Sequence, residues 1–199
     1  VFLSGSSLWY PQVQGYPYLV YSLQVGLPAG WSSISQGKRL ARETSDESAG
    51  DHWSIDLPQE EIYLIAANFT EYRQPVSMQQ GNVEAQVFLR EPDSQLANRY
   101  LEATDRYLQM YGQLIGDYPY SKFALVENFW ETGFGMPSFT LLGSKVIRLP
   151  FIINSSYPHE ILHNWWGNGV YVDYASGNWS EGLTAYLADH LIKEQQGRD

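Results

Sequence analysis

The sequence predicts an α+β fold, in which an antiparallel β region is followed by a region of mixed strands and helices. Three observations lead to this expectation. Residues 1–73 alternate strand-like stretches with turn signals, residues 94–115 carry a long helical pattern, and two short helical patterns end the chain. The chain turns polar from Tyr72 to Gly81, so we expect two domains, at 1–73 and 74–199.

Two stretches of the first region are predicted strands. Residues 18–25 are rich in aromatic and aliphatic side chains and end before a Pro-Ala-Gly turn signal, and residues 61–67 form an apolar run typical of a buried strand. The polar stretch 43–51 is expected to be an exposed hairpin loop.

In the second region we expect strands at 83–89, 122–127 and 139–147. The start signal Pro92-Asp93-Ser94 predicts a helix that runs to about Ile115. Its apolar stripe is expected to contain Leu101, Tyr107, Leu108, Tyr111 and Leu114.

Composition limits the functional classes. The 199 residues include 22 acidic and 12 basic side chains, giving a formal net charge of −10. This charge argues against nucleic acid as a partner, because binding phosphates needs a cationic surface. No apolar run approaches the length of a membrane span, so no transmembrane segment is predicted. The absence of cysteine excludes disulfides and thiolate ligands, and nothing in the composition indicates an oligomeric state.

The most specific motif is His159-Glu160-Ile161-Leu162-His163, a spacing typical of zinc metallopeptidase helices. An α-helix turns once every 3.6 residues, so His159 and His163 share one face and can direct two imidazole nitrogens at one metal ion. Glu160 projects from a neighbouring angle, where a carboxylate can accept a proton from an activated water molecule.

A catalytic zinc site usually has three protein ligands, and Glu181 is the candidate for the third. It lies in the first turn of a second predicted helix, whose apolar positions include Leu183, Tyr186, Leu187, His190 and Leu191. The alternative is an ordinary core helix with satisfied histidines. The surrounding signals favour the metal site: Ser155 or Ser156 can cap the helix, Pro158 suits its first turn, and Gly167 is a stop signal.

These motifs resemble those of the aminopeptidase N family of gluzincin zinc peptidases. The family shows His-Glu-x-x-His-x-Trp-Phe-Gly-Asn, which is similar to the stretch from His159 to Asn168. The stretch from Trp179 to Tyr186 is similar to the family's second motif around its glutamate ligand. Residues 111–122 resemble the segment that leads into the family's catalytic sheet, and residues 62–68 resemble the last strand of its N-terminal β domain.

The resemblance implies Zn²⁺ bound by His159, His163 and Glu181, with Glu160 as general base in the hydrolysis of a peptide substrate. It also implies a fold: residues 1–73 would be the C-terminal part of an N-terminal β domain, and 74–199 the first part of a thermolysin-like catalytic domain. The family's transition-state tyrosine lies far beyond its glutamate ligand. We therefore expect this chain to be part of a longer protein and to hydrolyse peptides weakly or not at all by itself.

Two departures from the family pattern bear on specificity. Between His163 and Glu181 there are 17 residues, one fewer than is usual, which we interpret as a loop deletion. The family's Gly-x-Met-Glu-Asn loop binds the substrate amino group through its glutamate, whereas here Gly135 and Met136 are followed by Pro137. Proline carries no charge, so aminopeptidase specificity is doubtful unless Glu127 or Glu131 substitutes for the lost glutamate. An alternative function is a catalytically impaired peptide-binding or scaffolding module.

Two further features are candidates for a role at the site. Asp173 lies between the two motif helices and could accept a hydrogen bond from a ligand histidine, as groups behind metal ligands usually do. The strand after Pro137 resembles the family's edge strand, which pairs with substrate backbone; an ordinary sheet strand is the alternative.

Overall fold

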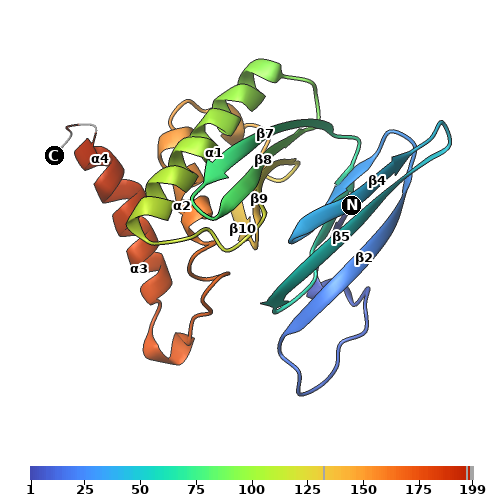
Figure 1. The fold of residues 1–199 in the computed structure, drawn as a ribbon, viewed down its shortest axis with the longest axis horizontal. Helices are drawn as coiled ribbons and strands as arrows, with labels where there is room; N and C mark the ends of the chain where they lie inside the picture. Colours follow the sequence, from blue (N-terminus) through green and yellow to red (C-terminus); the bar gives the residue numbers. More distant parts are fainter. Residues whose placement is uncertain (132, 196, 198–199) are drawn as a thin grey trace. The chain divides into compact units, whose positions relative to one another are not determined.

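The computed structural model describes residues 1–131, 133–195 and 197, and it has the predicted α+β class (Figure 1). The chain divides into two compact units. The first contains Val1–Thr70 and Arg90–Pro92, and the second contains Glu71–Leu89 and Asp93–Asp199. The division falls close to the expected boundary at residue 73. That the units are domains of a longer enzyme stays a prediction.

The first unit consists of two antiparallel sheets of three strands each. Their order follows from the pairing of neighbouring strands. One sheet contains β1 (Phe2–Leu3), β6 (Leu64–Ala67) and β3 (Ser32–Ile34), and the other contains β2 (Leu19–Pro28), β5 (Ser48–Gln59) and β4 (Lys38–Thr44).

The expected loop at 43–51 is wrong in its length. Strand β4 continues to Thr44 and β5 begins at Ser48, so only three residues turn the chain. The Ser45 hydroxyl oxygen accepts hydrogen bonds from the backbone N–H groups of Glu47 (3.3 Å) and Ser48 (3.0 Å). These local bonds close a tight turn, and the polar residues beside it remain in strands because much of their surface faces solvent.

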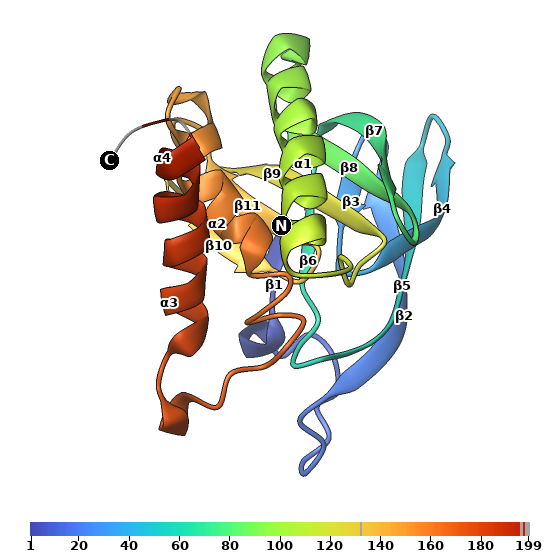
Figure 2. The same ribbon diagram turned by 60° about the vertical axis from the view of Figure 1, so that its left-hand side comes forward.

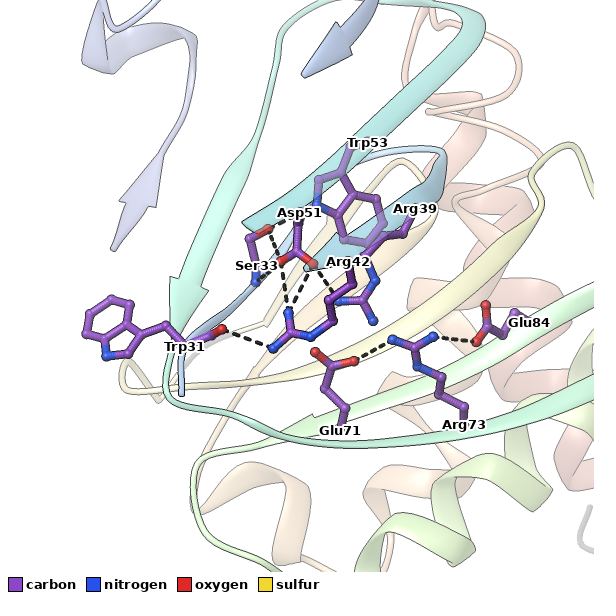
Figure 3. Close-up of polar contacts among 9 residues, drawn as sticks. All are labelled: Trp31, Ser33, Arg39, Arg42, Asp51, Trp53, Glu71, Arg73 and Glu84. Carbon is purple, nitrogen blue, oxygen red and sulfur yellow. Dashed lines mark hydrogen bonds and ion pairs between the residues drawn. The ribbon is translucent and has the colours of Figure 1, made fainter. Parts of the chain in front are cut away.

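A buried carboxylate joins the two sheets of this unit (Figure 3). Asp51 on β5 accepts hydrogen bonds from the Ser33 backbone N–H (2.8 Å) and hydroxyl (2.7 Å). Its Oδ1 also lies 3.2 Å from Arg39 Nη1 and 3.0 Å from Arg42 Nη1. The Trp53 indole donates to the same Ser33 hydroxyl oxygen at 3.0 Å. Asp51 is therefore satisfied on both oxygens, as a buried charge must be.

The second unit is built on a five-stranded sheet in the order β10-β11-β9-β8-β7. Strands β8, β9 and β11 are parallel to one another, and β10 pairs antiparallel with β11 at one edge. Every residue of β9 and β11 is buried, as expected for central parallel strands. The strands are β7 (Thr70–Met78), β8 (Gly81–Leu89), β9 (Lys122–Asn128), β10 (Gly133–Met136) and β11 (Phe139–Gly143).

Strand β7 carries the second ion-pair group in Figure 3. Arg73 lies between two carboxylates, with nitrogen–oxygen distances of 2.6 Å to Glu71 and 3.4 Å to Glu84. All three side chains are partly exposed, so these pairs contribute little to stability.

Helix α1 (Ser94–Leu114) confirms the predicted long helix. Asp93 caps it by accepting a hydrogen bond from the Leu96 backbone N–H at 2.9 Å. The predicted stripe is buried except for Leu114, which lies in the last turn and is 55% exposed. Among the described residues, no helix is both long and apolar enough to cross a membrane.

The C-terminal segment forms two helical stretches (Figure 2). The first is α2 (Ser156–Leu162), which contacts α1, β10 and β11. The second is a continuous rod of α3 (Trp179–Ala185), a π-helical turn at Tyr186–His190 and α4 (Leu191–Gln195). The predicted apolar stripe of this rod is wrong. Its buried positions are Ser180, Thr184, Ala188 and Ile192, whereas Leu183 and Tyr186 are exposed.

We predict that replacing Asp51 by alanine destabilises the first unit by about 3–5 kcal/mol, because Arg39 and Arg42 lose the carboxylate that neutralises them. The matched control is Asp46→Ala in the exposed β4–β5 turn, for which we expect a change within about 0.5 kcal/mol. Urea unfolding followed by tryptophan fluorescence measures both. Equal effects of the two substitutions would show that the buried cluster contributes nothing.

Candidate metal centre

Helix α2 buries one face and presents the histidines on another. Tyr157, Ile161 and Leu162 are completely buried. His159 and His163 remain 27% and 15% exposed at their side chains, and their Nε2 atoms are 3.1 Å apart. The i, i+4 spacing therefore brings the two nitrogens together, and the burial of the opposite face fixes the direction in which they point.

The start of α2 differs in detail from the expectation. Ser155 occupies the N-cap position, but its hydroxyl donates to the Phe151 carbonyl oxygen at 2.9 Å and does not cap the helix. Pro158 lies in the first turn, as expected. The helix ends at Leu162, before the predicted stop at Gly167.

Glu181, in the first turn of α3, completes a group of three. Its Oε2 lies 3.4 Å from His159 Nε2, and its Oε1 lies 3.4 Å from His163 Nε2. In the described part of the chain, these three residues form the single cluster of histidine and acidic side chains with metal-site spacing. The Glu181 side chain is 51% exposed, so solvent has access to the cluster.

The distances fit a zinc ion. In a tetrahedral site with metal–ligand bonds of about 2.0–2.1 Å, neighbouring ligand atoms lie about 3.3–3.4 Å apart. The three distances of 3.1, 3.4 and 3.4 Å are close to that spacing. Two imidazoles and a carboxylate are also a ligand set that zinc accepts, with the fourth position open to water. The role of these residues as ligands stays a prediction.

The electrostatics of the site favour neutral histidine. Burial lowers the pKa of His163, and the neighbouring His159 lowers it further. The neutral imidazole is the form that binds metals. The His163 Nδ1 atom faces the Trp166 carbonyl oxygen at 3.4 Å, so the second nitrogen is directed at the cluster.

Glu160 lies beside the cluster in a less polar environment. Burial, and then the charge of Glu181, raises the pKa of Glu160 to about 7. A bound cation would oppose this shift, because it stabilises the carboxylate. The site thus contains a carboxyl group whose proton affinity is suited to proton transfer near neutral pH.

The predicted substrate-binding residues lie at the β10 edge and its turn. A Cβ atom on Gly135 would lie 2.6 Å from Glu160 Oε2, so the bare backbone of β10 passes directly over the glutamate. Gly133, two residues earlier and on the same strand face, lies over the same carboxylate. Met136 and Pro137 are buried and lead into the turn towards β11. Their contact with a substrate stays a prediction.

The two glutamates considered as substitutes for the family's amino-group ligand have other partners. Glu127 is 4% exposed and accepts from Arg148 Nη1 at 2.7 Å. Glu131 is exposed and accepts from the Lys145 backbone N–H at 2.9 Å. Both carboxylates thus bind the segment that follows β11.

The structure places Asp173 away from its expected role. Its carboxylate accepts from the Ala175 backbone N–H at 3.1 Å and the Ser176 hydroxyl at 3.0 Å, and it caps a short 3₁₀ helix. Among the described residues neither oxygen has a hydrogen bond with a histidine. Binding to a ligand histidine therefore stays a prediction, without support from these contacts.

Sequence reasoning missed Gly133, Asn164 and Thr184. The signal for Gly133 was its spacing of two from Gly135, which leaves one face of a strand without side chains. Thr184 accepts a hydrogen bond from the Trp166 indole at 2.8 Å and so connects the rod to the segment after α2. Neither Thr184 nor Asn164 belongs to a recognisable pattern.

Comparison with known proteins supports the fold. No family model matches the chain, and no curated protein matches it in sequence. Solved structures do. An M1 zinc metallopeptidase from Deinococcus radiodurans is 18% identical with a TM-score of 0.71, and the match covers 92% of this chain and 42% of that one. A mutant of that enzyme bound to a Tyr-Ser-Ala substrate matches at the same identity and TM-score.

Aminopeptidase A from Legionella pneumophila, in complex with aspartic acid, matches with a TM-score of 0.72 at 13% identity, over 89% of this chain and 23% of that one. At such identities the likeness shows the fold alone. This chain thus has the fold of part of an M1 zinc metallopeptidase, and it spans less than half the length of these neighbours.

We predict that Thr184→Val destabilises the second unit by about 1–3 kcal/mol, because the Trp166 indole N–H loses its acceptor. The matched control is Ser180→Ala, one turn earlier on the same face. The Ser180 hydroxyl is buried without a hydrogen-bond partner among the described residues, so its removal should be neutral or stabilising. Thermal unfolding distinguishes the two, and the reverse order would contradict the contacts described here.

Proposed function

We propose that this chain carries the metal centre of a zinc-dependent metallopeptidase, aminopeptidase-like in fold, that hydrolyses peptide bonds. The observation that carries the proposal is the triangle of His159, His163 and Glu181, whose ligand atoms are 3.1–3.4 Å apart with Glu160 beside them. The fold neighbours support it, since they are zinc metallopeptidases.

The roles follow from position and chemistry. A zinc ion held by the three ligands would acidify a water molecule and polarise the scissile carbonyl group. Glu160 is the general base: it accepts the proton of the attacking water and delivers it to the leaving amine. Its raised pKa favours both transfers, because the group gains and loses a proton readily near neutral pH.

The substrate is an extended peptide that lies along β10. As the edge strand of its sheet, β10 leaves one side of its backbone free to pair with another chain. Glycine at 133 and 135 leaves no side chain between that backbone and Glu160. We assign Gly135, Met136 and Pro137 to substrate binding on this basis.

The alternative is a catalytically impaired peptide-binding or scaffolding module. Pro137 favours it, since no charge stands where the resembling family holds the substrate amino group. Glu160 weighs against it, because a module that only binds peptides needs no general base. An enzyme that cleaves without recognising a free amino end satisfies both observations.

We predict that the full-length protein retains about one zinc ion per chain after dialysis against a weak chelator, and that His159→Ala abolishes this zinc. His190→Ala is the control, because His190 is exposed and lies outside the cluster. Elemental analysis gives the answer. Absence of zinc from the wild type, or its retention in His159→Ala, would refute the assigned ligands.

We predict that Glu160→Gln lowers kcat for peptide hydrolysis roughly 10²- to 10⁴-fold while zinc binding is unchanged, because the amide cannot accept the proton of the water. The assay uses the full-length protein with free and N-acetylated forms of one peptide. Cleavage of both forms by the wild type indicates an endopeptidase-like enzyme, and cleavage of the free form alone indicates another amino-group ligand. Cleavage of neither would support the binding-module alternative.

A further inference from the structure

A buried polar network lies directly behind the β10 edge. Its centre is Ser138, in the turn from β10 to β11, whose backbone has a positive φ of 69°. The Ser138 backbone N–H donates to Asn164 Oδ1 at 2.7 Å. Lys122 Nζ donates to the Ser138 hydroxyl oxygen at 2.6 Å and to its carbonyl oxygen at 3.3 Å. Every polar atom of Ser138 is thus held by a group from another element.

Asn164 connects this turn to the helix with the candidate ligands. It follows His163 directly, and its Nδ2 donates to the carbonyl oxygens of Glu160 (3.2 Å) and Ile161 (3.1 Å) at the end of α2. One amide side chain therefore binds the last turn of the helix through its nitrogen and the β10–β11 turn through its oxygen. Such a bond pair fixes the spacing of the two elements.

That spacing matters because β10 and Glu160 are in close contact. The 2.6 Å between a Cβ placed on Gly135 and Glu160 Oε2 is less than a methyl group needs. The Thr140 hydroxyl donates to the Phe134 carbonyl oxygen at 3.0 Å and holds the strand from its other neighbour. A shift of β10 would therefore move a peptide bound to it relative to Glu160.

The composition of the network points to a positioning role. Ser138 and Asn164 are completely buried and Lys122 is 2% exposed. Burying an ammonium group and an amide is costly, and apolar side chains could fill the same space without that cost. Buried polar groups accept only a few arrangements, so they specify one geometry where an apolar contact would allow sliding.

We propose that Asn164 is a positioning residue for the peptide hydrolysis proposed above, with Lys122 as its support. Together they hold β10 at the distance from Glu160 and the three ligands at which an extended peptide presents its scissile bond. The inference rests on the proposed function for its effect on the rate, but the coupling of strand and helix can be measured without it.

The test compares Asn164→Ala with Tyr157→Phe in the zinc-loaded full-length protein. Tyr157 is an equally buried residue of α2, and its hydroxyl is hydrogen-bonded to Thr104 on α1 at 2.5 Å, away from the β10–β11 turn. Both variants should lower the melting temperature. Asn164→Ala alone should accelerate amide hydrogen exchange at 133–136 and lower kcat roughly 10- to 100-fold, with KM and zinc affinity changed less than about threefold.

Lys122→Met should show the same pattern with a smaller effect, because it keeps the length of the side chain and the Asn164 bond but removes the donors to Ser138. Unchanged exchange at 133–136 in Asn164→Ala would overturn the proposal, and so would faster exchange with an unchanged kcat. If the wild type hydrolyses no peptide, the proposed function fails. Faster exchange would then still support the coupling of strand and helix, and unchanged exchange would overturn that too.

Discussion

The burial of one face of α2 is the constraint on which the candidate site depends. This seven-residue helix is too short to be stable by itself, and its packing supplies what the backbone cannot. The Tyr157 ring packs edge-on against Tyr100 at a centroid distance of 4.8 Å, and Ile161 and Leu162 are fully buried. With that face fixed, the residues one and two places away must face the open side. Helix packing, and not the motif alone, therefore aims the two histidines.

The rod that carries Glu181 approaches α2 with small side chains. Ser180, Thr184 and Ala188 are buried at intervals of four, and their size allows the backbones to come close enough for Glu181 to reach both histidines. Large apolar residues on this face would push the carboxylate away. This explains why Leu183 and Tyr186, which look like core residues in the sequence, lie on the exposed side.

The sequence predicted what depends on short-range patterns. The start of α1 was predictable because Asp93 and the residues around it form a local capping signal, and the i, i+4 spacing of the histidines contains its own geometry. The stripe of the last rod was not, because hydrophobicity does not reveal that close approach of a carboxylate requires small residues. Nor was the Asp51 cluster, since its arginines and Ser33 are 9–18 residues away and meet the carboxylate only when the two sheets of the unit form.

Pro137 shows how one departure from a family pattern can change a side chain's work. Proline at the second position of a turn and a positive φ at the third is the combination that type II turns use, and Pro137 and Ser138 supply it. Serine is uncommon at a positive φ, so the turn persists because Asn164 and Lys122 bind all its polar atoms. A residue that binds substrate in the resembling family thus belongs here to a turn held rigid from behind. Selectivity for a free amino end is lost at this position, whereas the geometry of the edge strand is reinforced.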